Sequence, residues 1–377
     1  MMNISRRNFL KGAAAASVGS IIPMSMVTVE AEAGVAGGES FTFAWVTDQH
    51  IQLISGPGNK FVKSWDDGFK LAISEVMNAN PKPDFAYFGG DIAQAGLKAE
   101  MDHGLEMWSK TGLKVRAIQG EHDYFLDMGK STRAAYGKEA MPADNYTFEH
   151  KGVQFIALTT IRGDAAWEAK HAKNPQVRMN EMMRIDNYVD GSPFQLGKEG
   201  QAWLKKTVAG LDKNKHTIVL SHSPIQKIYN GWNFWTEDAE EIQAILAPFK
   251  RVTVLYNHVH QPMASQKGNI SFFSNFSTSW PWPHVSTVAD ATMCGDGAYK
   301  GCAKGADYYP NLILPYHRAD VANFRDATGW TFVNTNTGGK FEAEVTQWGE
   351  NPKRKVVWDG KLKEVGAGPA AKSQMNY

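Results

Sequence analysis

Five short apolar runs that each end in His, Asp or Glu restrict the fold of this chain more than any other feature of its sequence. The first run is "FTFAWVTDQH", residues 41–50, and the second is "DFAYFGGD", residues 84–91. Ionisable side chains are costly at the end of a buried strand unless a partner compensates their charge. Eight such side chains follow the five runs: Asp48, His50, Asp91, Glu121, His122, His222, His258 and His260.

The segments between these runs have helical periodicity. Residues 64–79 repeat apolar side chains at helical spacing, at Phe69, Ile73, Val76 and Met77. Further helices are predicted over about residues 97–110, over 197–211 and over 237–249, and each of them leads into an apolar run. Strands and helices that alternate in this order form βαβ units around a parallel sheet.

Other segments predict antiparallel strands. Residues 145–160 have the pattern of a hairpin with a Lys-Gly turn, and residues 329–348 and 355–360 alternate between apolar and polar side chains. The chain is therefore predicted to be an α/β protein with both parallel and antiparallel strands.

The eight side chains are expected to converge, because open parallel sheets bind ligands at the carboxyl ends of their strands. Three carboxylates and five imidazoles in one place need cations to hold them together. A single His in such a position is usually a half-buried packing residue, but here five of the eleven His follow the apolar runs. Mixed His and carboxylate ligands suit Zn, Mn or Fe and disfavour Ca or Mg as sole occupants.

The motifs that carry these residues resemble those of the calcineurin-like metallophosphoesterases over about residues 41–276. In chain order they are Asp48-x-His50, Gly89-Gly90-Asp91, Gly120-Glu121-His122-Asp123, Ser221-His222 and Asn257-His258-x-His260. The resemblance implies a four-layer αββα sandwich with mixed sheets. It also implies two metal ions, of Fe, Mn or Zn, and hydrolysis of a small phosphomonoester or phosphodiester by a metal-activated water.

The same resemblance implies a role for each motif residue. Asp91 would bridge the two metal ions, and Asp48, His50 and His260 would complete the ligands of the first. The second would be held by His222, His258 and Glu121. His122 would contact the phosphate or protonate the leaving oxygen, and Asp123 would orient His122.

Glu121 departs from the family pattern, which usually has Asn at this position. One hypothesis is that Glu121 ligates the second metal directly, since a carboxylate beside a cation gains Coulomb energy. The alternative is that it swings away and binds a substrate ammonium or an Arg. Asn257 replaces the usual Gly, and Asn tolerates the same left-handed backbone. Gln94 stands where purple acid phosphatases carry a tyrosinate ligand, which argues against an iron site of that kind.

Residues 277–327 are rich in Trp, Gly and Pro and are predicted to be an insertion. Trp280, Trp282 and His284 are candidate substrate contacts at the mouth of the site, although packing within the loop would explain the two Trp equally well. Cys294 and Cys302 are the only two Cys, and a local disulfide is expected in an oxidising compartment.

The N-terminus resembles a twin-arginine export signal. Arg6 and Arg7 precede an apolar stretch that is short for a spanning helix, and "AEA" ends at Ala33. Residues 1–33 are therefore predicted to be a cleaved signal read by the twin-arginine export machinery, with no stable membrane anchor afterwards and a periplasmic or secreted product. A metallophosphoesterase domain is predicted over residues 34–360, and a flexible tail over 361–377.

Two functions from different classes are compatible with this pattern. The first is the exported phosphoesterase, and the alternative is a non-hydrolytic metal-binding or partner protein whose site Glu121 has altered. The 40 basic and 39 acidic residues argue against a nucleic acid polymer as substrate, because tracking of phosphates needs a basic surface. A Ser-His-Asp hydrolase is not supported, since the sequence has no Gly-x-Ser-x-Gly motif.

Overall fold

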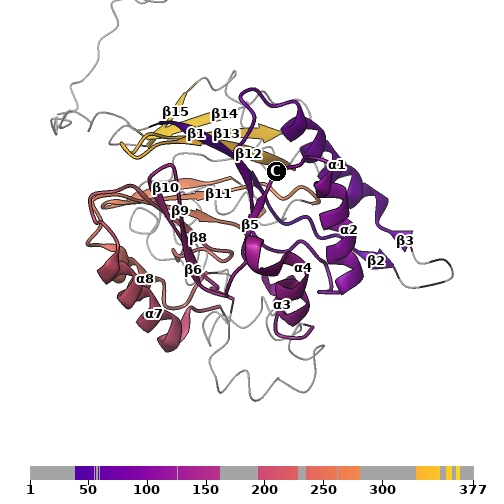
Figure 1. The fold of residues 1–377 in the computed structure, drawn as a ribbon, viewed down its shortest axis with the longest axis horizontal. Coiled ribbons are helices and arrows are strands. Elements are labelled where there is room, and N and C mark those ends of the chain that lie inside the picture. Colours follow the sequence, from indigo (N-terminus) through magenta and orange to yellow (C-terminus); the bar gives the residue numbers. More distant parts are fainter. Residues whose placement is uncertain are drawn as a thin grey trace, which may run out of the picture. The chain divides into compact units, whose positions relative to one another are not determined.

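Two β-sheets pack face to face, with helices on their outer sides (Figure 1). The first sheet contains β1 (Phe41–Val46), β4 (Phe85–Phe88), β5 (Val115–Ala117), β12 (Gly329–Thr335), β13 (Phe341–Gln347), β14 (Arg354–Trp358) and β15 (Leu362–Val365). The second contains β6 (Tyr146–His150), β7 (Val153–Ala157), β8 (Thr217–Leu220), β9 (Val252–Tyr256), β10 (Ala264–Lys267) and β11 (Ile270–Ser274). A small hairpin, β2 (Leu53–Ile54) and β3 (Lys60–Phe61), stands apart. The helices among the described residues are α1 (Lys63–Met77), α2 (Lys98–Ser109), α3 (Glu121–Tyr124), α4 (Lys130–Ala140), α7 (Gly197–Gly210) and α8 (Ala239–Leu246).

This computed structural model describes only part of the chain. The described residues are 39–54, 56, 58, 60–124, 126–161, 194–227, 235–260, 262–280 and 328–348, together with the backbone of 354–358 and 362–365. Trp282, His284, Cys294 and Cys302 lie outside them, as do the predicted signal and most of the predicted insertion. Among the described segments, none of the helices combines the length and the apolar character that a membrane crossing needs.

Both sheets are mixed, with parallel strands next to one another and antiparallel strands beside them. The strand order is β15-β14-β13-β12-β1-β4-β5 in the first sheet and β10-β11-β9-β8-β7-β6 in the second. β1, β4 and β5 are parallel, as are β7, β8, β9 and β11, whereas β12 and β6 pair antiparallel with their neighbours. The carboxyl ends of the parallel strands in each sheet therefore share one edge, and the polar side chains are carried there.

Aromatic side chains fill the space between the sheets. The ring of Phe155 on β7 lies 6.3 Å from Phe41, 6.0 Å from Phe43 and 5.9 Å from Phe85, centroid to centroid. All four side chains are buried. Rings of this size each bury a large apolar area, which is a major contribution to stability.

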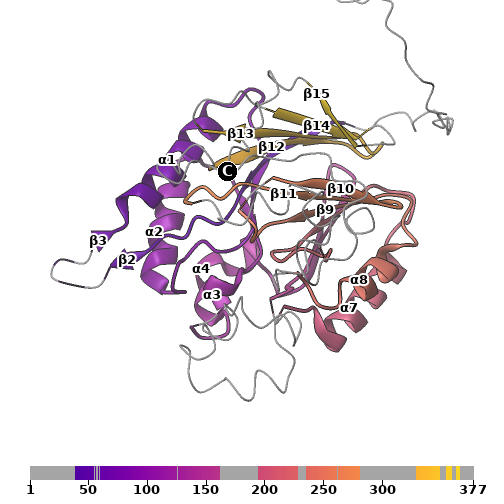
Figure 2. The same cartoon turned by 180° about the vertical axis from the view of Figure 1, so that it is seen from behind.

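The outer faces are covered by two helix pairs that lie on opposite sides of the molecule (Figure 2). Phe69 of α1 and Trp108 of α2 pack on Phe88 of the first sheet, at 6.0 and 4.9 Å between ring centroids. α7 and α8 contribute Leu204, Val208, Ile242 and Leu246 to an apolar cluster with Val219 and Val254 of the second sheet. The predicted four-layer αββα sandwich is confirmed. Met77 alone departs from the predicted buried face of α1: it is the last residue of the helix and is 47% exposed.

Two local predictions have different outcomes. The predicted hairpin with a Lys-Gly turn is present, with φ of 45° at Lys151 and 81° at Gly152. In contrast, β15 lies within the segment that was predicted to be a flexible tail, and its Leu362 pairs antiparallel with Trp358 of β14. The domain boundary at residue 360 stays a prediction.

His216 precedes β8 and makes the stability of the fold depend on pH. Burial, together with nearby Arg251, lowers the pKa of His216 to about 3, and its Nε2 lies 2.8 Å from Thr253 Oγ1. In the unfolded chain His216 takes up a proton near pH 6.5, whereas in the folded chain it stays neutral down to about pH 3. The folded state therefore loses stability as the pH falls below 6.5. We expect the free energy of unfolding to fall by about 1.4 kcal/mol per pH unit between pH 6 and 4 through this group. Urea unfolding of the wild type and of His216→Gln at pH 7.5 and 5.0 would measure it: equal losses in both proteins would contradict the assignment.

Candidate metal centre

The structure brings all eight predicted side chains together at the shared edge of the sheets. Their donor atoms form three overlapping groups, and within each group all donor atoms lie within 4.8 Å of one another. The groups are Asp48, His50 and His260; Asp91, Glu121, His222 and His258; and His50, Asp91 and His122. Every member is buried. The segments that follow five strands, β1, β4, β5, β8 and β9, thus bring these side chains to one place.

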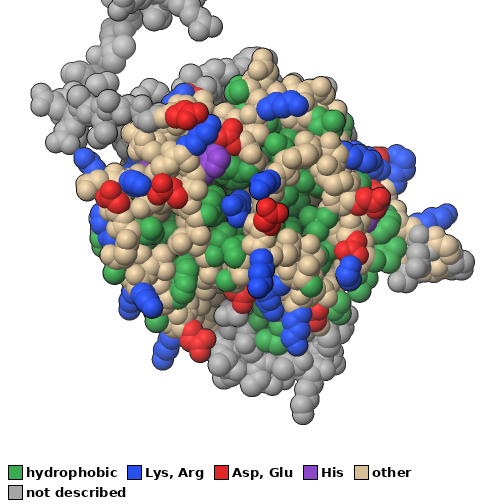
Figure 3. Space-filling model, viewed as in Figure 1, with side chains coloured by type: hydrophobic (Ala, Val, Ile, Leu, Met, Phe, Trp, Pro, Cys, Tyr) green, Lys and Arg blue, Asp and Glu red, His purple; other side chains and the backbone are tan. Residues whose placement is uncertain are grey.

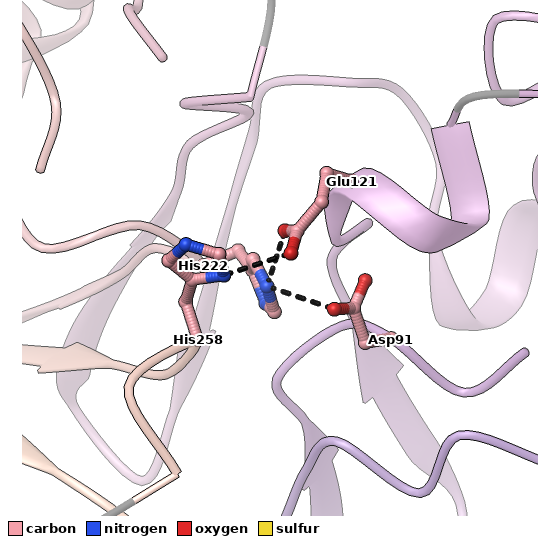
Figure 4. A group of neighbouring side chains, drawn as sticks. All are labelled: Asp91, Glu121, His222 and His258. Atoms are coloured by element: carbon pink, nitrogen blue, oxygen red, sulfur yellow. Dashed lines mark ion pairs between the residues drawn. The ribbon is translucent and has the colours of Figure 1, made fainter. Parts of the chain in front are cut away.

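Glu121 faces both imidazoles of the second group (Figure 4). Its Oε2 is 2.8 Å from Nε2 of His222, and its Oε1 is 2.8 Å from Nδ1 of His258. Asp91 approaches from the other side, with Oδ2 at 3.4 Å from the same nitrogen of His222. The four side chains point toward a common centre from α3 and from three separate loops.

The first group is joined to the second through Asp91. Nε2 of His260 lies 3.2 Å from Asp48 Oδ1 and 3.1 Å from Nε2 of His50. Oδ2 of Asp91 lies 3.9 Å from the same nitrogen of His50. Since this oxygen also faces His222 at 3.4 Å, it stands between the two groups.

The backbone at the centre is strained. Non-glycine residues rarely adopt a positive φ, and such strain clusters at functional sites. Among the described residues, the following five ligand candidates have it: Asp48 (52°), His50 (46°), Asp91 (54°), His258 (69°) and His260 (53°). Gly120 is required for a different reason, because a Cβ there would lie 2.0 Å from Asp91 Oδ1.

Hydrogen bonds outside the centre decide which nitrogen of His222 and which nitrogen of His260 faces inward. Nδ1 of His222 lies 2.7 Å from the carbonyl of Gly89, and Nδ1 of His260 lies 2.8 Å from the carbonyl of Trp280. A carbonyl only accepts, so both Nδ1 atoms carry a proton that they donate. In the neutral ring Nε2 then presents a lone pair inward, where it meets carboxylate oxygens or, for His260, another imidazole nitrogen.

The electrostatics of the bare centre follow from burial and from the neighbouring charges. Burial, with the neighbouring His122 and His260, lowers the pKa of His50 well below its usual range, so His50 is neutral. Burial alone would lower the pKa of His222, but the carboxylates of Asp91 and Glu121 hold it well above the usual value. Burial likewise opposes ionisation of Glu121, yet His258 and His222 keep its pKa well below normal. The site thus favours the charged form of Glu121, whereas burial and the charge of Glu121 raise the pKa of Asp91 above its usual value.

These residues fit metal ions. Four buried inward-facing atoms make no hydrogen bond within the described part of the chain, although ion-pair partners lie close: Asp48 Oδ1, Asp91 Oδ2, Glu121 Oε2 and His222 Nε2. Buried polar atoms without hydrogen bonds are costly. Lone pairs that face one another at about 3 Å repel unless a cation or a proton lies between them. Oxygen and imidazole nitrogen ligands in this mixture match the preferences of Zn, Mn and Fe.

His122 lies beside the centre, with its ring 4.7 Å from that of His50, centroid to centroid. Its Nδ1 lies 2.6 Å from the carbonyl oxygen of Gln94, and its main-chain N–H donates to Asp91 Oδ1 at 2.9 Å. The main chain of Gln94 therefore holds the ring at Nδ1. The role of Asp123 in orienting His122 stays a prediction.

Asp123 holds the loops that carry the ligands. Its Oδ2 accepts from the amides of Asp91 (2.7 Å) and Gly120 (3.1 Å), and its Oδ1 accepts from Ala93 (3.1 Å). Burial and the Asp91 charge raise the pKa of Asp123 to about 7. Its carboxylate thus ties the loop after β4 to the loop after β5.

Two further polar side chains have roles that sequence analysis missed. Gln94 Oε1 lies 2.7 Å from His50 Nδ1, which leaves Nε2 of that ring for the centre. Asn257 is not among the described residues with positive φ, so the left-handed backbone that Asn tolerates is not adopted here. Its side chain instead accepts from Trp45 Nε1 (2.8 Å) and donates to Tyr87 OH (3.1 Å), which joins the two sheets beneath the centre. Long-range contacts of this kind leave no local signal in a sequence.

Aromatic side chains stand at the His50 side of the centre. The ring of Trp280 lies 5.0 Å from His50 and 4.3 Å from His260, and that of Trp65 lies 6.5 Å from His50. Both indoles are partly exposed. Trp65, in the first turn of α1, was not expected from the sequence. The other two candidate substrate contacts, Trp282 and His284, lie outside the described residues.

Comparisons with known proteins agree with this geometry. Residues 41–262 match the family described as calcineurin-like phosphoesterase, and residues 3–21 match the signal sequence of the twin-arginine translocation pathway. A 3′,5′-cyclic-nucleotide phosphodiesterase of Nostoc sp. is 19% identical over 250 residues, which are 66% of this chain and 82% of the relative.

Two solved structures resemble the fold. A dimetal phosphatase from Danio rerio has a TM-score of 0.50 at 10% identity, covering 85% of this chain and 99% of that one. A structure described as PhoD has a TM-score of 0.53 at 13% identity, covering 90% of this chain and 74% of that one. At these identities the likeness concerns the fold alone.

Proposed function

This chain belongs to the calcineurin-like phosphoesterase family, and on that premise we propose that it is a binuclear-metal enzyme that hydrolyses a small phosphomonoester or phosphodiester. It is a metal-dependent phosphoric ester hydrolase that carries a twin-arginine signal, which directs it to the periplasm or beyond. The export machinery that reads this signal is its proposed partner. These findings favour hydrolysis over the non-hydrolytic alternative.

The observation that carries the proposal is the pair of ligand groups joined through one oxygen of Asp91. Asp48, His50 and His260 form the first half-site, and Glu121, His222 and His258 form the second. Asp91 Oδ2, which faces His50 at 3.9 Å and His222 at 3.4 Å, would bridge them. Nitrogen and oxygen donors in this proportion would suit Fe, Mn or Zn.

Glu121 is proposed as a direct ligand in the second half-site. Both of its oxygens are directed at imidazole nitrogens 2.8 Å away, and Oε2 makes no hydrogen bond within the described residues. A carboxylate so placed gains more from a cation than a neutral amide would. The alternative, in which Glu121 turns toward a substrate ammonium or an Arg, would leave both imidazoles without this neighbour.

The residues around the centre would divide the chemistry between them. The metal ions that these ligands would hold would supply Lewis acidity and would lower the pKa of a water molecule for in-line attack on phosphorus. His122 is proposed to contact the phosphate or to give a proton to the leaving oxygen. The contact of its Nδ1 with Gln94 O and of its amide with Asp91 Oδ1 would hold the ring beside the centre for this role. Asp123 would not contact the substrate. It would keep the ligands in position by accepting hydrogen bonds from the amides of Asp91 and Gly120.

The substrate is proposed to be small. On the described part of the face in Figure 3, basic and acidic side chains are interspersed. A nucleic acid polymer would need a continuous basic surface to bind its phosphates. Trp280, together with Trp65, offers flat apolar surface next to His50 on which a ring could stack. The Nostoc relative acts on 3′,5′-cyclic nucleotides by its name, so a cyclic nucleotide is the first natural substrate to test.

Hydrolysis of bis(p-nitrophenyl) phosphate with added Mn²⁺, measured beside Glu121→Asn, tests the proposal. We expect the wild type to turn over, and the variant to bind the second Mn²⁺ at least about tenfold more weakly because it loses a charged ligand. Mn²⁺ titration of the metal-free protein measures that affinity, and Glu106→Asn, at an exposed position of α2, is the matched control.

Two other results of these measurements would contradict parts of the proposal. A silent wild type beside an active Glu121→Asn would favour a binding protein in which Glu121 has shut down diester hydrolysis. Unchanged Mn²⁺ affinity in the variant would contradict direct ligation by Glu121.

A further inference from the structure

We propose that Ser277 and Ser279 are positioning residues for the first half-site of the metal centre. The segment Ser277–Trp280 follows β11 and lies about 230 residues from Asp48 in the chain. The inference rests on the binuclear centre proposed above and assigns to this segment a part in assembling it.

Two hydroxyl groups converge on the main chain of Asp48. Oγ of Ser277 and Oγ of Ser279 both donate to the carbonyl oxygen of Asp48, at 2.7 and 2.9 Å. The amide of Thr278, between them, donates to the carbonyl of Thr47 at 3.3 Å. Asp48 has a φ of 52°, a conformation that residues with a side chain rarely adopt. These three hydrogen bonds hold the peptide groups on both sides of the Asp48 Cα in place, so that Asp48 Oδ1 faces the centre.

The same segment orients a second ligand. The main-chain carbonyl of Trp280 lies 2.8 Å from His260 Nδ1, so that Nε2 of the ring points inward. The position of Trp280 in turn depends on Ser277, whose Oγ accepts from the amides of Ser279 (3.0 Å) and Trp280 (3.2 Å). All of these serine atoms are buried, and both serines are 0% exposed. One hydroxyl, that of Ser277, therefore connects the positions of Asp48 and His260.

The second half-site is positioned by other groups. Nδ1 of His222 lies 2.7 Å from the carbonyl of Gly89, and the loops before α3 and after β4 are held by Asp123. Loss of the two serine hydroxyls should therefore weaken one metal-binding event and leave the other unchanged. Groups that orient ligands in this way typically contribute about 10–100-fold to metal affinity.

Mn²⁺ titration of the metal-free full chain, followed by calorimetry, tests the inference without any assay of activity. The variants His50→Ala and His258→Ala identify which binding event belongs to the first and which to the second half-site. We expect the first event to weaken about tenfold in Ser279→Ala, where Ser277 still donates to Asp48, and toward a hundredfold in Ser277→Ala/Ser279→Ala. The single variant keeps the test available if the double variant fails to fold.

Two controls separate positioning from general destabilisation. Thr253→Ala removes a buried hydroxyl that pairs with His216 at 2.8 Å, away from the centre, and should lower thermal stability without any change in Mn²⁺ affinity. Ser271→Ala removes a buried hydroxyl of β11 that makes no hydrogen bond within the described residues, and should change neither quantity.

The inference is overturned if the double variant binds both ions as the wild type does. It is also overturned if both events weaken together, or if Thr253→Ala weakens the first event to the same degree, since the serines would then support only the fold. If the wild type binds a single Mn²⁺, the proposed binuclear centre itself is contradicted. The titration of the wild type gives this result before any serine variant is measured.

Discussion

Replacement of Asp91 by Asn should lower the turnover of a phosphodiester by roughly a thousandfold or more, with loss of at least one of two bound metal ions. Oδ2 of Asp91 is the atom that faces both half-sites, at 3.9 Å from His50 Nε2 and 3.4 Å from His222 Nε2. An amide keeps the shape of the side chain but loses the negative charge that two adjacent cations require.

The measurement pairs steady-state kinetics with metal analysis of the purified protein. Asp84→Asn is a matched control, because Asp84 is a carboxylate that pairs with His150 at 2.7 Å and is partly exposed, away from the centre. We expect that control to keep its full metal content and activity. An Asp91→Asn protein that retained two metal ions would show that this carboxylate does not bridge them.

Replacement of His122 by Ala should lower kcat by about 10²–10⁴-fold on substrates with poor leaving groups, while the metal content stays intact. The reason is that an alkoxide leaving group needs a proton, whereas p-nitrophenolate leaves without one. The loss on bis(p-nitrophenyl) phosphate should therefore be much smaller than the loss on an alkyl phosphoester. The ratio of the two losses is the quantity to measure.

His150→Ala is the control for this substitution, since His150 is a partly exposed imidazole that pairs with Asp84 on the protein surface. Loss of metal from His122→Ala would contradict a role outside the ligand set. Equal losses on good and poor leaving groups would show that His122 contacts the phosphate and does not protonate the leaving oxygen.

Much of the fold was predictable because its signals are local. The helical spacing in α1 and α2 and the apolar runs of β1, β4, β8 and β9 depend on residues a few positions apart. The four-layer arrangement came from the resemblance of the ordered motifs to a family, and the packing of the two sheets confirms it. β15 escaped prediction because a four-residue edge strand in a polar segment has almost no periodicity to detect.

The candidate site was predictable to a similar degree. Because parallel strands end at one edge of a sheet, residue type and position in the strand were enough to bring eight side chains together. What local patterns did not reveal are contacts whose partners are distant in sequence. Asp123 accepts hydrogen bonds from the amides of two loops, and Asn257 joins Trp45 to Tyr87.

The sequence alone therefore determined which residues gather at the centre, since ligand type and strand order are properties of short segments. Only the tertiary structure decided how each ligand is held: Gln94 beside His50, Trp280 beside His260, and two serines on the carbonyl of Asp48. Each of these hydrogen bonds joins loops from different strands. Their geometry is fixed by the packing of two complete sheets, and no local pattern in the chain records it.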